Sequence, residues 1–467
     1  VGADLAAPGA TVRGNGSIDL TAKGSPSRAL AVNLATDLDG LEVRAGDAFI
    51  KPAGTPLVAQ ATATAAEGGA VDVPSFALRL GPLDAKGSFR RAANGSLDAR
   101  VTLERFALGE LARLLPAMAD NAFAAARIGF RAAVAGNPAQ PASIEARLED
   151  FYFAQGRSTL TGNATVQNPD APRIRFDFNA PNLDLDELLP QGGGEEAPAD
   201  DGPVAIPDIV RRIDAEGAVR AARGRMNQID FTTLVAALTM KNGILTLTSM
   251  DFDAYGGHFS AARTKVDLSR EQPRFDLQMT LRDVDANQIL THQANLPNTV
   301  SGRLNTEMSI AGAGLAWEQI SQSLSGDLGL GLQRGKFEKL DLEQATLGGL
   351  VSKVPLLKLD KRTSTQLKDL AGRFKVEKGR MTLVQPMKTE TAQGPLELSG
   401  SIGLDKTLDL RGTLQLQPAV IARLSGNKLK LDRALPVGLK LGGTLLDPKV
   451  SGLETEALGA ALGRPAP

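Results

Sequence analysis

The sequence predicts an all-β fold: a long, twisted antiparallel meander that curls into an elongated apolar groove, with a few short helices. Three observations predict it. Apolar residues recur at every second position along much of the chain, turn-forming residues separate these runs, and segments with helical periodicity are few and short. At 467 residues the chain is long for one ordinary domain, so we expect an architecture that grows by adding strands.

Alternation of apolar and polar residues is the strongest of these signals. A strand with one buried and one wet face requires it, because successive side chains point to opposite faces. The runs include Leu30, Val32 and Leu34, then Leu97, Ala99, Val101 and Leu103, and later Leu245, Leu247, Phe275, Leu277, Met279 and Leu281. Each run has the length of a strand.

Turn-forming residues lie between the runs, as at Lys23–Ser27, Asn94–Gly95 and Lys241–Gly243. These residue types supply the backbone angles that a chain reversal needs. Short connections of this kind predict antiparallel neighbours, because a parallel pair needs a crossover of a dozen or more residues.

The clearest predicted hairpin runs from Leu396 to Leu416. Its apolar residues are all even-numbered: Leu396, Leu398, Ile402, Leu404, Leu408, Leu410, Leu414 and Leu416. A reversal at Asp405–Thr407 therefore places them on one face, with partner numbers that sum to about 812, as with Leu398 and Leu414. Gly400 then faces Gly412, and we interpret this glycine pair as a place where the sheet curls.

The alternating residues of the second half are the predicted lining of a lipid groove. Moving a 16-carbon acyl chain through water costs on the order of 12 kcal/mol, whereas an aliphatic trough keeps the tail dry without any reactive group. The predicted lining is Leu245, Leu247, Phe275, Leu277, Met279 and Leu281, together with the eight even-numbered residues of the hairpin.

Two alternatives use the same pattern. The apolar rows could form a closed β core, in a structural or assembly scaffold of the cell envelope that carries no lipid. A membrane protein built from strands would also alternate, but it needs aromatic girdles at both interfaces, and the chain has one Trp and two Tyr. A bound lipid would distinguish the groove from the scaffold.

Short helices are predicted at Arg105–Ala119, Leu185–Leu189 and Asp285–Leu290. A fourth segment has helical spacing and nearby lysines, which suits either a helix that plugs the end of a sheet or a contact with a membrane or partner. Its residues are Leu347, Leu350, Val351, Lys353, Val354 and Lys358.

Composition divides the chain into four parts. An acidic segment rich in glycine and proline, residues 191–203, has nothing to bury and is predicted to be a flexible linker. It separates an N-terminal β-groove segment, residues 1–190, from a second β-groove region, residues 204–453. Residues 454–467 are predicted to form a short helix and a tail.

Composition and motifs also exclude several function classes. With 52 basic and 53 acidic residues, the formal charge is -1 and no block forms a surface for nucleic acid. The chain has no cysteine and two histidines far apart in sequence, and it lacks phosphate-loop and nucleophile-elbow motifs, so we expect no metal, no cofactor and no enzymatic activity. No window is apolar enough for a membrane-spanning helix.

Several segments, taken in order, resemble the AsmA family of bacterial envelope proteins. They are Leu234–Phe259, Arg282–Leu290, Leu324–Phe337, Phe374–Met381 and Leu398–Leu404, and the resemblance covers roughly residues 204–450. The family is similar to TamB and to eukaryotic bridge-like lipid transfer proteins. The resemblance implies a periplasmic β-groove that binds phospholipid acyl chains, contacts a membrane surface or envelope proteins, and serves lipid transfer and outer-membrane biogenesis. It also implies an inner-membrane tether, an N-terminal helix that this sequence does not contain.

Overall fold

The computed structural model describes residues 10–25, 29–119, 123–188, 211–270, 272–314, 316–340, 364–428 and 430–451. The chain forms two compact units. Unit 1 consists of residues 1–190, 207–226 and 237–243, and unit 2 of residues 191–206, 227–236 and 244–467. The predicted linker at 191–203, the amphipathic segment from Leu347 to Lys358 and the predicted tail at 454–467 lie outside the described residues.

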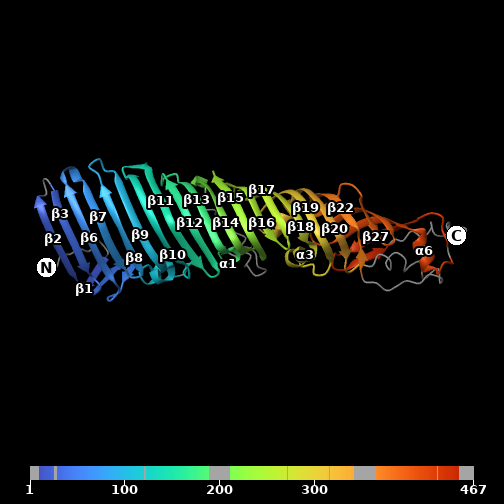
Figure 1. Cartoon of the computed structure of the whole chain (residues 1–467), viewed down its shortest axis with the longest axis horizontal. Coiled ribbons are helices and arrows are strands. Elements are labelled where there is room, and N and C mark those ends of the chain that lie inside the picture. The colour runs from blue at the N-terminus through green and yellow to red at the C-terminus, as the bar shows by residue number, and fades with distance from the viewer. Residues whose placement is uncertain are drawn as a thin grey trace. The chain divides into compact units, whose positions relative to one another are not determined.

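Unit 1 contains one large sheet whose strands follow the chain order (Figure 1). These strands are β2 (Ser17–Ser25), β3 (Ala29–Asp37), β6 (Leu57–Ala66), β7 (Val71–Leu80), β8 (Leu83–Arg91), β9 (Leu97–Ala107), β10 (Arg127–Asn137), β11 (Gln140–Gln155), β12 (Ser158–Gln167), β13 (Arg173–Asp184) and β14 (Asp214–Met226). From β2 to β13 each strand pairs antiparallel with the next. The all-β meander predicted from the alternation is confirmed.

One pair departs from the antiparallel expectation. Strands β13 and β14 are parallel, with Ile174 opposite Ala215 and Phe178 opposite Val219. The chain leaves β13 at Asp184 and enters β14 at Asp214, which gives it enough residues to return to the same end of the sheet before the next strand begins.

A second, three-stranded sheet in unit 1 consists of β1 (Ala10–Gly14), β4 (Leu41–Ala45) and β5 (Phe49–Lys51). The side chain of Lys51 is fully buried there. Its ammonium donates to the backbone carbonyls of Asp39 at 3.1 Å and of Leu41 at 2.6 Å, and burial lowers the pKa of Lys51. These bonds tie the last residue of β5 to the first residue of β4 and to the loop before it.

Unit 2 is a second antiparallel meander. Its strands are β16 (Ile244–Ala254), β17 (Gly257–Asp267), β18 (Arg274–Asp285), β19 (Val300–Ala313), β20 (Ser325–Phe337), β21 (Thr365–Gln366), β22 (Asp369–Glu377), β23 (Arg380–Leu383), β24 (Met387–Thr391), β25 (Gly394–Gly403), β26 (Leu408–Leu416), β27 (Leu435–Gly443) and β28 (Pro448–Ser451). Strand β15 (Ile229–Lys241) has its first residues in unit 2 and its last in unit 1. Two short strands, β23 and β24, lie one after the other between β22 and β25, and each of them pairs with both neighbours.

The predicted helices are present with different bounds. The segment predicted at Arg105–Ala119 starts as strand, because β9 continues to Ala107, and then forms the 3₁₀ helices η2 (Leu108–Arg113) and η3 (Pro116–Met118). The other two correspond to α1 (Leu185–Leu188) and α3 (Ala286–Ala294). Helices α4 (Trp317–Ser323) and α6 (Pro418–Leu424) and the 3₁₀ helix η1 (Glu67–Gly69) were not predicted.

Helix α3 begins where the sequence indicated, because Asp285 caps it. The Asp285 carboxylate accepts a hydrogen bond from the backbone N–H of Gln288 at 2.9 Å, which satisfies one of the free donors of the first turn. The helix ends at Asn295, which has a left-handed backbone conformation.

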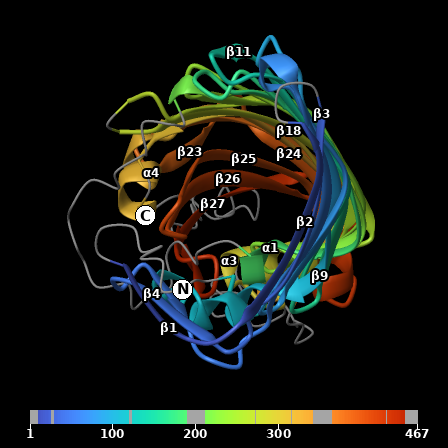
Figure 2. The same cartoon turned by 90° about the vertical axis from the view of Figure 1, so that its left-hand side faces the viewer.

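The strands of unit 1 bend, so that one face of the sheet is concave (Figure 2). β-Bulges provide a local cause, because the extra residue kinks the strand and increases its twist. They occur between Thr62 and Thr64, between Val73 and Phe76, and between Leu148 and Phe151.

The predicted hairpin forms, but its register differs from the prediction. Partner numbers sum to 810, as in Leu396 with Leu414 and Leu398 with Gly412, so the predicted pairing of Leu398 with Leu414 is wrong by two residues. The reversal is centred on Asp405, whose carboxylate accepts hydrogen bonds from the N–H of Thr407 at 3.0 Å and from its hydroxyl at 2.7 Å.

The predicted glycine pair is therefore wrong as well. Gly400 lies opposite Leu410 and Gly412 lies opposite Leu398, so the two glycines do not face each other, and the Leu398 side chain covers Gly412. A shift by two residues keeps every side chain on its original face. The apolar residues of the two strands consequently still share one face, while Leu404 lies in the turn between them.

A packed core occupies the C-terminal part of unit 2. Helix α6 contributes Val420, Ile421 and Leu424, and it packs against the apolar faces of β25, β26 and β27. Leu396, Leu414 and Leu416 at this contact are almost completely inaccessible to solvent.

Replacing Leu414 by alanine should lower the free energy of unfolding by about 2–5 kcal/mol, because it removes buried methyl groups and leaves a cavity. Urea unfolding followed by far-ultraviolet circular dichroism measures this. The exposed Leu446→Ala variant is the control and should change stability by less than about 0.5 kcal/mol. Equal effects of the two substitutions would contradict the packed core.

Candidate functional site

The most extensive feature of unit 1 is a cross-strand row of apolar residues on one face of its sheet. The row consists of Leu34, Ala61, Phe76, Gly87, Val101, Ala132, Leu148, Ala164, Phe176 and Gly217, one from each strand from β3 to β14 in the large sheet. All of them are only half-buried. A second packed layer would bury them, so this face is open over the length of the row.

A second row runs beside the first. It consists of Val73, Phe89, Ala99, Val134, Ala146, Val166, Ile174 and Ala215. Neighbouring residues in such rows are about 5 Å apart across the strands, close enough for their side chains to touch. The two rows together make a continuous aliphatic surface.

Large side chains in these rows cover glycines on the next strand. A Cβ atom added to Gly87 would lie 2.9 Å from the Phe76 ring, and one added to Gly312 in unit 2 would lie 2.6 Å from the Phe275 ring. Each ring thus occupies the space that a side chain on the neighbouring strand would otherwise fill.

In unit 2 the predicted lining residues of β18 lie on one apolar face. Phe275 is opposite Gly312, Leu277 opposite Ile310, Met279 opposite Met308 and Leu281 opposite Thr306. Phe275, Leu277 and Met279 are half-buried, and Leu281 is buried.

The rows of β18 continue to both sides. On one side, Leu245 of β16 is joined to Phe275 through Val266 of β17, while Leu247 lies opposite Thr264. On the other side, Met308 is followed by Leu328 and then Phe374. The structure therefore brings the predicted residues of β16 and β18 into one surface.

An apolar cavity of about 260 Å³ lies further along unit 2. Four residues of the predicted hairpin line it: Leu398, Ile402, Leu408 and Leu410. Leu398 and Leu410 also belong to the packed core, together with Leu396, Leu414 and Leu416, which do not line the cavity.

The prediction from sequence missed several residues that line this cavity. Leu290 and Leu296 come from α3 and the loop after it, and Leu304, Leu330, Leu332 and Leu370 come from β19, β20 and β22. The strand residues carry the same alternation, which could have identified them. The helix residues carry no such signal, because their position depends on how α3 packs.

Lys339 is the charged residue among the described side chains that line the cavity. It follows the end of β20 and is exposed overall. The neighbouring acid Glu338 is already engaged, since it accepts hydrogen bonds from Lys336 at 2.6 Å and from Ser301 at 2.7 Å. Lys339 thus borders the cavity as an exposed residue, while the cavity wall itself is almost wholly apolar.

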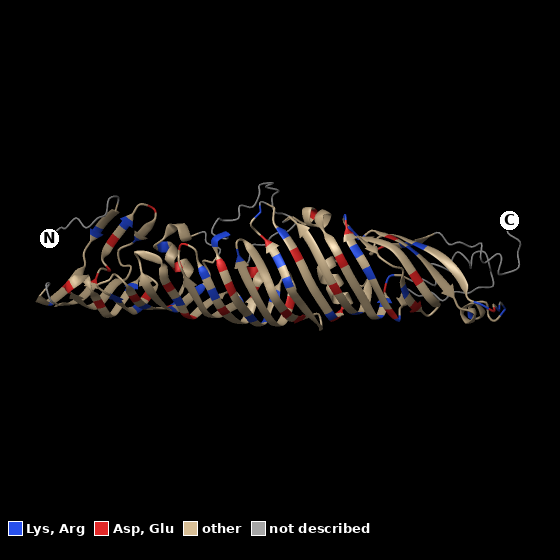
Figure 3. Ribbon diagram, turned by 90° about the horizontal axis from the view of Figure 1, so that it is seen from above, with Lys and Arg blue, Asp and Glu red and all other residues tan. Residues whose placement is uncertain are grey.

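Acidic and basic residues are interspersed along the strands of both units (Figure 3). Because successive side chains point to opposite faces, the charged residues that alternate with the apolar rows lie on the opposite face of each sheet. Cross-strand ion pairs include Asp177–Arg220 at 2.6 Å in unit 1 and Asp327–Lys375 at 3.3 Å in unit 2. Exposed pairs of this kind stabilise a fold by at most about 1 kcal/mol each. Their main effect is to keep this face in water.

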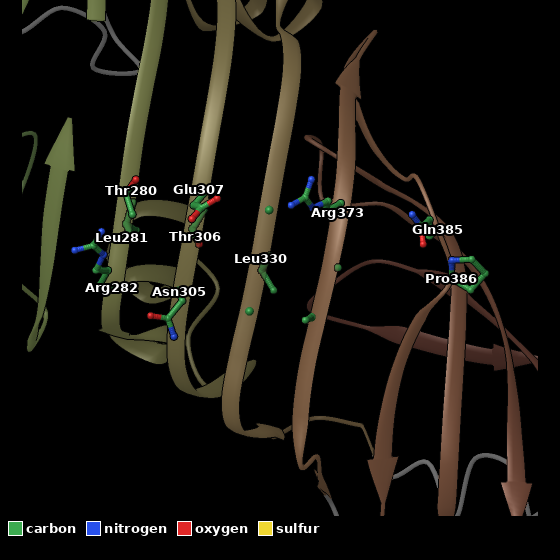
Figure 4. A pocket seen from close by; sticks show the side chains of 14 residues that line it. Thr280, Leu281, Arg282, Asn305, Thr306, Glu307, Leu330, Arg373, Gln385 and Pro386 are labelled. Carbon is green, nitrogen blue, oxygen red and sulfur yellow. The ribbon is translucent and has the colours of Figure 1, made fainter. Parts of the chain in front are cut away.

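A hollow of about 630 Å³ lies over β18, β19, β20 and β22 of unit 2. Its labelled side chains include Thr280, Asn305, Glu307 and Arg373, which surround the strand that carries Gly329 and Gly331 (Figure 4). The missing side chains of these glycines form the hollow, since a Cβ at either position would meet nothing closer than 3.7 Å.

Comparisons with known proteins point to one family. The model of the AsmA family matches residues 155–385. Protein AsmA of Escherichia coli (strain K12) is 25% identical over 205 residues, which is 40% of this chain and 33% of that protein, so the match spans about a third of the relative's length. No solved structure matches the chain. None of the helices in the described part of the chain has the length and apolar character to cross a bilayer.

The open face of unit 1 and the closed core of unit 2 should differ in how much stability they lose when a charged side chain is introduced. Leu148→Asp places a carboxylate on a half-buried row from which it reaches water, so the thermal midpoint should fall by only about 2–4 °C. Leu416→Asp places the same charge in the packed core and should lower the midpoint by more than about 10 °C or prevent folding. Circular dichroism during heating measures both, and equally severe loss in Leu148→Asp would mean that the row is covered.

Proposed function

The chain belongs to the AsmA family of bacterial envelope proteins, and from this premise we propose that its apolar faces bind lipid acyl chains. In this proposal the protein acts in the periplasm, supports transfer of phospholipid between the inner and outer membranes, and has no enzymatic activity. Its partners are phospholipid, the membrane surface and other envelope proteins.

The observation that carries the proposal is the half-buried apolar row of unit 1. Ten strands in succession present an aliphatic or glycine position to the same open face. Apolar surface left in water costs roughly 25 cal/mol for each Å², and an acyl chain laid along the row removes such surface from water on both partners. A polar ligand has no such apolar surface to remove from water, so it would gain no binding free energy from this face.

The cavity of unit 2 supports the same proposal and adds a polar end. Apolar side chains dominate its lining, and the exposed Lys339 borders it, so that the flexible lysine side chain can reach a head group at the cavity. This arrangement suits an amphiphile whose tail enters the cavity and whose anionic head group remains near the ammonium group. We propose Lys339 as a contact for that head group.

A structural scaffold without lipid cargo is the second candidate. The observation that favours it is the packed core of β25–β27 with α6, where the alternating leucines bury one another. A closed core of this kind needs no ligand. The scaffold remains the alternative for that part of unit 2, whereas the open rows of unit 1 do not fit it.

Two adjacent residues on β18 provide a matched test of lipid binding. Leu277 belongs to the apolar face and Gln278 to the polar face of the same strand. Leu277→Asp should weaken the affinity for a fluorescent fatty acid about tenfold, since two methylenes that lose contact correspond to about 1.6 kcal/mol. Gln278→Asp adds the same charge and should leave the affinity unchanged.

The measurement is a fluorescence titration on protein purified without detergent and then delipidated. Native mass spectrometry of the protein before delipidation should show lipid adducts. An absence of adducts together with equal affinities of the two variants would overturn the proposed function and favour the scaffold.

Lys339→Met tests the head-group contact separately. The variant should bind palmitate about two- to fivefold more weakly, as expected for one exposed ion pair, and should bind hexadecanol unchanged, because the two ligands share the tail and differ in charge. Lys339→Arg should restore palmitate binding. Loss of both ligands in Lys339→Met would instead indicate a structural role for this residue.

A further inference from the structure

The first strand of the large sheet of unit 1 has a free edge. Strand β2 pairs with β3 in an unbroken register from Ser17–Asp37 to Ser25–Ala29, and among the described residues no strand pairs with its other edge. It stands at the end of the sheet in Figure 1. Its outer edge therefore presents a row of unpaired backbone N–H and C=O groups.

Two large apolar side chains on β2 are mostly exposed. Ile18 is 59% and Leu20 is 62% accessible to solvent, although Leu20 lies opposite Leu34 and so begins the apolar row described above. Protected edges commonly carry a bulge, a proline or charged side chains; β2 has no bulge or proline between Ser17 and Ser25, and its charged residues are one acid, Asp19, and one base, Lys23. The edge is suited to accept another strand.

The sequence of β2 is complementary to itself in the antiparallel direction. The middle of the nine-residue strand is Thr21. When two copies pair about this residue, all nine positions are used, Thr21 faces the partner's Thr21, and Asp19 faces the partner's Lys23. A shift of the centre to Asp19 would instead place two aspartates opposite each other, and a shift to Lys23 would place two lysines opposite each other.

From this complementarity we infer that β2 is a self-association surface, which pairs antiparallel with β2 of a second copy of this chain. Neither Asp19 nor Lys23 has an ion-pair partner within the described part of its own chain, so both are available. The twofold axis runs perpendicular to the sheet, which keeps the apolar faces of both copies on the same side and places Leu20 opposite the partner's Ala22. The inference does not depend on lipid binding.

A charge exchange tests the proposed register. Asp19→Lys and Lys23→Asp each place like charges opposite one another, so each should raise the dissociation constant of the dimer at least fivefold in sedimentation equilibrium. The double variant Asp19→Lys/Lys23→Asp restores opposite charges and should return to within twofold of the parent value. Asp98→Lys, on the polar face of the central strand β9, is the control and should dimerise like the parent.

Disulfide crosslinking tests directly whether the two β2 strands pair about Thr21. The chain has no cysteine, so Thr21→Cys introduces one thiol for each copy. Opposed Cα atoms in an antiparallel pair are about 4.5–5.5 Å apart, within the range that a disulfide spans, so oxidation with diamide should link most of the dimer. Ser17→Cys places the two thiols eight residues apart, at about 27 Å, and should not crosslink.

Several outcomes would overturn the inference. A monomer at all concentrations would mean that the edge stays unpaired or that another segment of the same polypeptide covers it. Equal crosslinking of Thr21→Cys and Ser17→Cys, or a double variant as weak as the single ones, would mean that the copies associate elsewhere or in another register.

Discussion

Each apolar side chain has to remain on one face while the chain passes through strand after strand, and the bulges show how this is achieved. In β7 the apolar residues switch from odd positions, Val71 and Val73, to even ones, Phe76 and Leu78, and the bulge lies between Val73 and Phe76. The same change occurs in β11 between Leu148 and Phe151. The extra residue reverses the alternation, and the following apolar side chains stay in line. The bulges thus both bend the strands and keep the apolar surface continuous.

The same alternation produces two different environments. In unit 1 the rows are half-buried, while around Leu414 of unit 2 they are buried. The difference comes from what lies opposite: helix α6 and the curved β25–β27 close over one another, and the unit 1 rows have no such layer among the described residues. Whether a strand lines a trough or a core is therefore decided by what packs against its apolar face, and the alternation within the strand does not show this.

The parts of the fold and the site that could be predicted from the sequence are those that depend on residues close together in the chain. The period of two identifies the strands and the shared face of β25 and β26, and Asp285 identifies the start of α3, because these depend on nearby residues. The hairpin register was wrong by two residues because any even shift preserves the face, and the turn around Asp405 decides among such shifts. The parallel pair β13–β14 depends on the long connection between them. The cavity lining from α3 depends on tertiary packing.

The arrangement of the rows bears on transfer as well as on binding. A transfer surface needs sites of similar affinity along its length, because a single deep site would retain the lipid. In unit 1 the row alternates large residues such as Leu148 with small ones such as Ala164, and charged groups are absent from it. Each position thus offers a similar apolar contact, so a tail gains about the same free energy at successive strands. The cavity is different in kind, because in the proposed function the neighbouring Lys339 contacts the head group and so distinguishes one end of an amphiphile from the other. The two units therefore contribute separate properties to the proposed function: unit 1 provides an even path and unit 2 a polar anchor.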